Sequence, residues 1–152
     1  MMKRFTLTFA AVLIVLSALN AQVQNPVKWN YTASKKSDKE YIVTISATLE
    51  PNWHIYSMNT PTGGPVPTTV TFKRNPLVTI DGKTTEDGRP KTVHDEIFGI
   101  DVKYYGETVS FVQTVKLKSP VKTNLSGTVK YMVCNDKMCL PPKTVPFNIQ
   151  LQ

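Results

Sequence analysis

Apolar and polar residues alternate along most of this chain, and this feature limits the fold more than any other. One run places Tyr41, Val43, Ile45, Ala47 and Leu49 at every second position. Three further runs hold apolar residues at Val109, Phe111, Val115 and Leu117, at Val129, Tyr131 and Val133, and at Val145, Phe147, Ile149 and Leu151. Successive side chains of a strand point to opposite faces, so each run predicts a strand with one face on a core and the other in water.

Helices are not expected, because no stretch keeps a 3.6-residue apolar period and the chain holds 11 prolines. Three shorter runs are also candidate strands: Val27–Tyr31, His54–Ser57 and Thr69–Phe72. Turn and loop residues separate the runs at Ser37–Lys39, Pro61–Pro67, Asp81–Lys83 and Ser126–Gly127. About seven short strands with such turns predict an all-β fold, an immunoglobulin-like antiparallel β-sandwich, with an up-and-down barrel as the alternative.

The first 21 residues have the pattern of a secretory signal peptide. Lys3 and Arg4 precede an apolar stretch at positions 10–16, and Ala21 is a small residue suited to cleavage. Residues 22–152 are then expected to form one domain. No later stretch approaches about 18 consecutive apolar residues, so the mature chain is expected to have no membrane span.

The basic surplus does not point to nucleic acid. The formal net charge is +7, but the basic residues are scattered along the sequence at positions such as 35–36, 73–74, 116, 118 and 130. A nucleic-acid surface usually combines a basic face with interleaved aromatic residues. No Gly-rich phosphate loop is present either, so no nucleic-acid partner is expected.

Cys134 and Cys139 are the only cysteines, and an exported chain enters an oxidising compartment where disulfides persist. Four intervening residues fit a hairpin loop, whose facing residues lie about 4.5–5.5 Å apart between Cα atoms, within the range of a disulfide. Strand parity points Cys134 away from the core, towards solvent or a covering loop. A structural disulfide that closes a loop of six residues stabilises the fold by only about 2 kcal/mol. Spacing and parity leave an exchange-active and a structural disulfide equally open.

A metal site is a weaker alternative. The two thiolates with His54 and His94 would complete a zinc site, and with Met58, Met132 or Met138 they would suit Cu(I). The cysteine spacing is longer than in paired zinc ligands, and each histidine is isolated in the sequence.

The stretch from Tyr131 to Phe147 holds a tyrosine, both cysteines, two prolines and a Thr-Val-Pro strand. Two other stretches stand out: His94–Gly99, with an acidic pair followed by Phe98 and a glycine, and Pro51–Tyr56, with three aromatic or imidazole rings. Together the three stretches resemble a known family, the N-terminal periplasmic domain of the thiol:disulfide interchange protein DsbD. The first is similar to the family's active-site hairpin, the second to the loop that caps the disulfide, and the third to the strand beside it.

The resemblance implies an immunoglobulin-like sandwich that exchanges thiols and disulfides in the periplasm without a cofactor. It implies that Cys139 forms the mixed disulfide with partners and that Cys134 resolves it. The implied partners are the thioredoxin-like domain of a membrane disulfide reductase, as electron donor, and periplasmic thiol oxidoreductases, including isomerases and cytochrome c maturation factors. The module is expected to be a monomer, either alone or as a fragment, with its donor on another protein.

The resemblance also assigns the residues around the disulfide. The expected cap consists of Asp95, Glu96, Ile97, Phe98 and Gly99, and the neighbouring strand contributes His54 and Tyr56. The two carboxylates disfavour a thiolate, whereas Lys137 or a protonated His54 favours one. This chain departs from the family pattern in having four residues between the cysteines, Ile97 at a position usually held by phenylalanine, and His54 in place of a tyrosine.

Overall fold

The computed structural model describes residues 24–96 and 98–152. The expected signal peptide and Ile97 lie outside these described residues. The strands are β1 (Val27–Lys35), β2 (Glu40–Leu49), β3 (His54–Tyr56), β4 (Thr69–Phe72), β5 (Val78–Gly88), β6 (Lys91–Asp95), β7 (Ile100–Tyr105), β8 (Thr108–Leu117), β9 (Thr123–Tyr131), β10 (Val133–Cys134) and β11 (Lys143–Leu151). The all-β prediction is confirmed.

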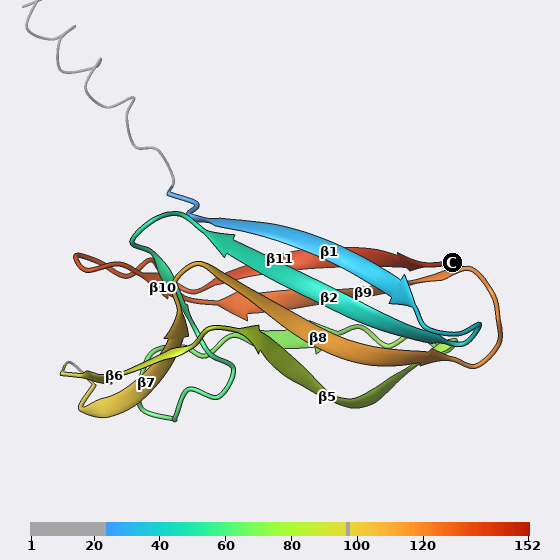
Figure 1. The fold of residues 1–152 in the computed structure, drawn as a ribbon, viewed down its shortest axis with the longest axis horizontal. Coiled ribbons are helices and arrows are strands. Elements are labelled where there is room, and N and C mark those ends of the chain that lie inside the picture. The colour runs from blue at the N-terminus through green and yellow to red at the C-terminus, as the bar shows by residue number, and fades with distance from the viewer. Residues whose placement is uncertain (1–23, 97) are drawn as a thin grey trace, which may run out of the picture.

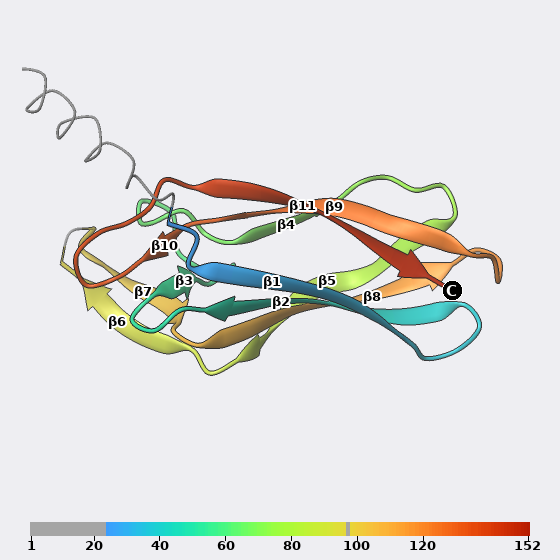
Figure 2. The same cartoon turned by 90° about the horizontal axis from the view of Figure 1, so that it is seen from above.

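The strands form three antiparallel sheets that make a sandwich (Figures 1 and 2). One layer has the order β1-β2-β8-β5, and the facing layer has the order β11-β9-β4. A third sheet, β10-β3-β7-β6, continues the sandwich at one end, on the left of both views. The predicted immunoglobulin-like sandwich is confirmed, although the described residues contain more strands than the seven or so expected.

The core lies between the two long layers, where the predicted alternation places it. All five apolar residues of the β2 run are buried, with exposed fractions of 8 % or less. The inward face of β8, in the same layer as β2, is buried at Val109, Phe111, Val115 and Leu117, and the inward face of β11, in the facing layer, is buried at Phe147, Ile149 and Leu151. Each of these strands has one wet face, as an antiparallel sheet at a protein surface allows.

The segment Asp81–Lys83, predicted as a turn, is a bulge within β5. The pairing of β5 with β8 shifts register between Asp81 and Thr85, and Gly82 has a φ of 71°. The buried Gln113 side chain satisfies the irregular backbone, because its amide nitrogen donates to the Asp81 carbonyl at 2.7 Å. A glycine with positive φ is typical of bulges as well as of turns, which is why the sequence was misleading.

Ser126–Gly127, also predicted as a turn, lies inside β9. Gly127 pairs with Phe72 of β4 on one side and with Phe147 of β11 on the other. A Cβ atom at this position would collide with the Thr71 carbonyl oxygen and the Phe147 ring. Glycine is needed here for a close approach of three strands and not for chain reversal.

The described residues contain no helix long and apolar enough to cross a membrane.

Candidate active site

The two cysteines close a hairpin at the end of the molecule formed by the third sheet. Cys134 and Cys139 form a disulfide and face each other as an antiparallel pair, with their Cα atoms 4.0 Å apart. The Leu140 N–H donates to the Val133 carbonyl at 2.9 Å and closes the ladder. The sequence spacing therefore predicted the hairpin correctly, although the Cα separation is shorter than the expected range.

Asn135 organises the loop between the cysteines. Its side-chain Oδ1 accepts the N–H groups of Lys137 and Met138, each at 2.9 Å, and its own N–H donates to the Met138 carbonyl at 2.9 Å. Asparagine commonly builds such side-chain turns. Lys137 is exposed on the loop, and Met138 is 49 % exposed. The loop thus has a defined shape while its tip is exposed to solvent.

The two sulfur-bearing residues differ sharply in exposure. Cys139 is exposed, whereas Cys134 is only 2 % exposed. Cys134 packs with Tyr56 and Val102 in a small apolar cluster that is separate from the main core. Parity correctly turned Cys134 away from the main core, but the strands β3 and β7 cover it in place of solvent. The cause is a change of sheet, because the chain leaves β9 after Tyr131 and then pairs with β3 as β10.

His54 and Tyr56 of β3 form a polar chain that ends on the buried sulfur. The Tyr56 hydroxyl donates to Cys134 Sγ at 3.3 Å. A phenol has one proton, so the His54 Nε2 atom, 3.3 Å from the same hydroxyl oxygen, donates to it in this arrangement. The His54 ring also packs on Tyr104 with 4.4 Å between ring centroids.

Burial keeps the side chains of His54 and Tyr56 uncharged. Burial lowers the pKa of His54 below 6.5, against the opposing charges of Asp136 and Asp95. Burial also raises the pKa of Tyr56 above 10, and the neighbouring Asp95 and Tyr104 raise it further. Near neutral pH the imidazole is therefore neutral, and the phenol keeps the proton that it donates to sulfur.

Of the expected cap residues, Asp95 ends β6, and Glu96, Phe98 and Gly99 lie between β6 and β7. The Gly99 N–H donates to the Asp95 carbonyl at 2.7 Å, and the Phe98 N–H donates to Asp95 Oδ1 at 3.2 Å. Gly99 has a φ of 65°, and Phe98 is 38 % exposed. Glu96 is exposed in the same turn.

This turn lies at the same end of the molecule as the cysteine loop (Figures 1 and 2). The charge of Asp95 acts on both His54 and Tyr56, which places it near the polar chain. Closure of the turn over the disulfide remains a prediction, and Ile97 lies outside the described residues.

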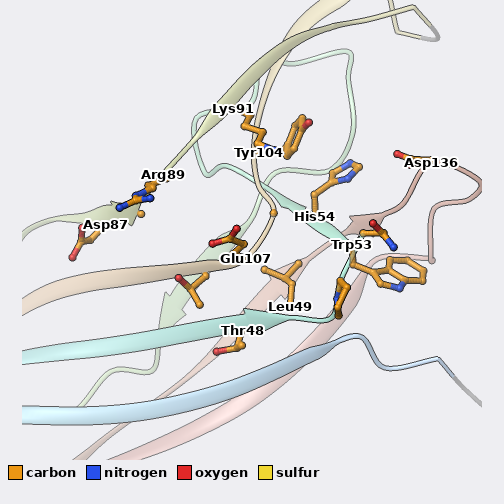
Figure 3. A pocket seen from close by; sticks show the side chains of 15 residues that line it. Thr48, Leu49, Trp53, His54, Asp87, Arg89, Lys91, Tyr104, Glu107 and Asp136 are labelled. Carbon is orange, nitrogen blue, oxygen red and sulfur yellow. The ribbon is translucent and has the colours of Figure 1, made fainter.

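A groove of about 1250 Å³ opens beside the cysteine loop. Figure 3 shows Trp53, His54 and Asp136 on its wall, with Arg89 and Asp87 further along. Neither cysteine lines the groove. The disulfide is therefore not part of this groove, and the exposed Cys139 is accessible from the loop side.

Nothing in the sequence pointed to Glu86, whose carboxylate anchors the segment that follows β3. It accepts hydrogen bonds from Ser57 Oγ at 2.7 Å, the Met58 N–H at 2.6 Å, Asn59 Nδ2 at 3.0 Å and the Tyr105 hydroxyl at 3.2 Å. Burial and the adjacent Glu86 raise the pKa of Tyr105 to about 12. The network fixes the residue next to Tyr56, and no local sequence signal connects it to Glu86.

The zinc alternative finds no set of histidine, cysteine or carboxylate ligands among the described residues. No group of three or more histidine, cysteine, aspartate or glutamate side chains there is placed to hold a metal ion. The second histidine, His94, instead contacts Asp101 across the β6–β7 pair, with 2.9 Å between Nδ1 and Oδ1.

The comparisons with known proteins fit this geometry. The family model described as "Thiol:disulfide interchange protein DsbD, N-terminal" matches residues 20–151. No curated protein matches the chain.

Three solved structures have a similar fold. The reduced N-terminal domain of DsbD from Neisseria meningitidis is 16 % identical, with a TM-score of 0.56 and coverage of 84 % of this chain and 89 % of that one. The N-terminal periplasmic domain of ScsB from Proteus mirabilis is 18 % identical, with a TM-score of 0.58 and coverage of 88 % and 49 %. A complex between the DsbD and PilB N-terminal domains from Neisseria meningitidis matches at 15 % identity, with a TM-score of 0.53 and coverage of 84 % and 87 %.

Proposed function

This chain belongs to the family of DsbD N-terminal domains, and from that premise we propose that it exchanges thiols and disulfides through Cys134 and Cys139. The observation that carries the proposal is the unequal exposure of the two cysteines within one disulfide. Cys139 is open to a visiting protein, whereas Cys134 is buried with a hydroxyl donor on its sulfur. Such a bond can be attacked from one side and has a stabilised leaving group on the other.

The first step is attack by a partner thiolate on the Sγ atom of Cys139. A new sulfur–sulfur bond forms between the partner and Cys139, the Cys134–Cys139 bond breaks, and its electron pair leaves on Cys134. The Tyr56 hydroxyl donates to that sulfur and stabilises the developing negative charge. A leaving thiol of lower pKa departs faster, so the hydrogen bond directs attack to Cys139.

The second step releases the reduced module. The partner's second thiolate attacks the partner's own sulfur in the mixed disulfide, which expels Cys139 as a thiolate. Two electrons have then passed to the module, two protons complete its thiols, and the partner is left as a disulfide. The reverse sequence passes the electrons on: the Cys139 thiolate attacks the disulfide of an acceptor, and Cys134 resolves the mixed disulfide.

We place this cycle in the periplasm, between a thioredoxin-like domain of a membrane reductase and thiol oxidoreductases. Family membership supports the placement, and so does the similar fold of the N-terminal periplasmic domain of ScsB. The DsbD–PilB complex supports a partner that is itself a folded protein. Three exposed apolar side chains at this end, Val93, Phe98 and Met138, offer it a contact surface.

The cap residues and Lys137 then control access and charge. Asp95 and Glu96 oppose thiolate formation while the module waits for a partner, and Lys137 favours it. A partner that displaces the turn at Phe98 moves these carboxylates away from the sulfurs and packs its own apolar surface against Phe98.

Trapping of the mixed disulfide tests the assignment. A Cys134→Ser variant, mixed with an oxidised thioredoxin-like protein, should accumulate a mixed disulfide through Cys139 because the resolving thiol is gone. The matched Cys139→Ser variant should trap little, since its remaining thiol is buried. Mass spectrometry of the linked peptides identifies the sulfur. A trap that forms only through Cys134 would reverse the roles, and exchange no faster than in the urea-unfolded chain would mean a structural disulfide.

A further inference from the structure

Basic residues that are scattered in the sequence gather at the end of the fold opposite the disulfide. Three loops meet there: residues 36–39, 73–77 and 118–122. The Leu117 N–H donates to the Lys39 carbonyl at 2.7 Å, and the Lys118 N–H donates to the Leu77 carbonyl at 3.0 Å, so the end of β8 joins the loops. Figure 1 shows these connections on the right, with the cysteine loop on the left. We call this group of loops and the adjoining strand ends the distal end.

The charge of the distal end is strongly positive. Its exposed cations are Lys35, Lys36, Lys39, Lys73, Arg74, Lys116, Lys118 and Lys122. Its acidic side chains are Asp38, Glu40 and Asp81. Two of these carboxylates are in salt bridges, Asp38 with Lys35 at 2.9 Å and Asp81 with Lys116 at 2.7 Å. Eight basic side chains against three acidic ones give the distal end a surplus of positive charge. Most of the net positive charge of the described side chains is therefore at this end.

Apolar side chains are exposed among these cations. Leu77 is 39 % exposed, Ile80 is 39 % exposed and Val121 is 42 % exposed. Asn75 ties the second loop to the start of β9, directly after the third loop, since its Nδ2 donates to Thr123 Oγ1 at 3.1 Å and to the Asn124 carbonyl at 2.7 Å. The aliphatic tips are therefore presented from a fixed framework.

A hollow of about 390 Å³ lies in the same place. Its walls include Phe72 and Ile80, and its charged lining comes from Lys73, Arg74 and Lys118. Cations around an apolar hollow match a ligand that is anionic at its head and apolar behind it.

We propose that the distal end docks on a bilayer that contains anionic phospholipids. Cations near such a surface are attracted to the headgroups, while aliphatic side chains enter the boundary with the acyl chains. Neither the charge attraction nor the apolar insertion alone gives stable attachment, but the two together do. Nucleic acid fits less well, because its single strands are recognised by exposed aromatic platforms, and the exposed apolar residues here are aliphatic.

Docking by this end also orients the reactive bond. The ten residues of β8 run from the disulfide end to the distal end and span about 30 Å at the rise of a strand. A molecule seated on its distal loops would hold Cys139 away from the bilayer surface and open to soluble partners.

Vesicle co-sedimentation of the oxidised mature chain tests the proposal. The probes are vesicles of phosphatidylcholine alone and vesicles in which about a third of the lipid is phosphatidylglycerol. We expect partitioning to be at least about tenfold stronger on the anionic vesicles and to weaken steeply with salt, since headgroup attraction is screened. Equal partitioning on the two vesicles, or none on either, would overturn the proposal.

Charge variants separate a located site from net charge. The distal variant is Lys73→Gln/Arg74→Gln/Lys118→Gln/Lys122→Gln. Its partitioning on anionic vesicles should weaken by about tenfold or more. The control variant is Lys28→Gln/Lys103→Gln/Lys130→Gln/Lys143→Gln, which removes the same number of charges at the disulfide end. Its partitioning should stay unchanged. Equal losses in the two variants would refute a distal site. Leu77→Ser/Val121→Ser tests the apolar contact and should weaken partitioning about fivefold, with circular dichroism as the check that each variant is folded.

Discussion

Replacement of Tyr56 by phenylalanine tests the central claim that Cys134 is the leaving sulfur. The change removes the hydroxyl that donates to Cys134 Sγ at 3.3 Å and keeps the ring that packs in the small cluster. Hydrogen bonds to charged groups contribute about 1.5–3 kcal/mol, and we take the lower figure because sulfur is a soft, weak acceptor. The Cys134 thiol pKa should then rise by about one unit in the variant, since one unit corresponds to 1.36 kcal/mol.

The kinetic consequence follows from how much charge Cys134 carries in the transition state. If about half to all of the hydrogen bond is realised there, the barrier rises by about 0.7–1.5 kcal/mol and reduction slows about three- to tenfold. The assay is the second-order rate constant for reduction of the oxidised module by a reduced thioredoxin-like protein. Thiolate absorbance in a Cys139→Ser background gives the Cys134 pKa.

Tyr104→Phe is the matched control. Tyr104 packs on His54 in the same cluster, yet the hydroxyl that donates to sulfur belongs to Tyr56. The control should leave the rate within about twofold, because surface hydroxyl deletions away from such contacts change little. An unchanged rate and thiol pKa in Tyr56→Phe, or equal slowing in the control, would refute the assignment.

Three further predictions concern the scaffold. Glu86→Ala should lower the free energy of unfolding in urea by about 2–4 kcal/mol, because buried donors lose their acceptor, whereas the exposed Asp87→Ala on the same strand should change it by less than about 0.5 kcal/mol. Burial holds the His54 pKa below 6.5, so the unfolded chain binds the proton first and stability should fall as the pH drops below 6.5, a decline that His54→Phe should reduce. Gly127→Ala should cost about 3 kcal/mol by overpacking, measured by thermal unfolding; an unchanged melting temperature would contradict it.

The sequence predicted the strands that have one face on the core. In β2 and β8 the buried positions alternate with half-exposed ones, which is the pattern that a period of two reveals. It failed for β5, whose eleven residues have no buried position and a bulge in the middle. This strand lies at the edge of its sheet, and two of its three half-buried positions hold the polar Thr84 and Glu86, so an alternation of apolar residues is missing.

The site was predictable in part for the same reason. Cysteine spacing is local, so the hairpin follows from it. The burial of Cys134 depends on the change of sheet after Tyr131, and the anchoring of β3 depends on Glu86, some thirty residues further along the chain. Both are long-range contacts, and neither leaves a periodic trace in the sequence.

The same change of sheet explains how the fold can tolerate cycles of reduction. The long layers are held by pairings that do not involve the disulfide: β9 and β11 pair over the whole of Thr123–Tyr131, before the chain reaches Cys134. The bond closes a loop of only six residues. Its loss gives the unfolded chain more conformational entropy and lowers the free energy of unfolding by about 2 kcal/mol, whereas such domains have total stabilities of about 5–15 kcal/mol. Reduction should therefore loosen β10 and the cysteine loop, which pair with β3 through only two residues, and leave the sandwich folded. A disulfide that joined the two layers would stabilise more, but the fold would then depend on the bond that the proposed function must break.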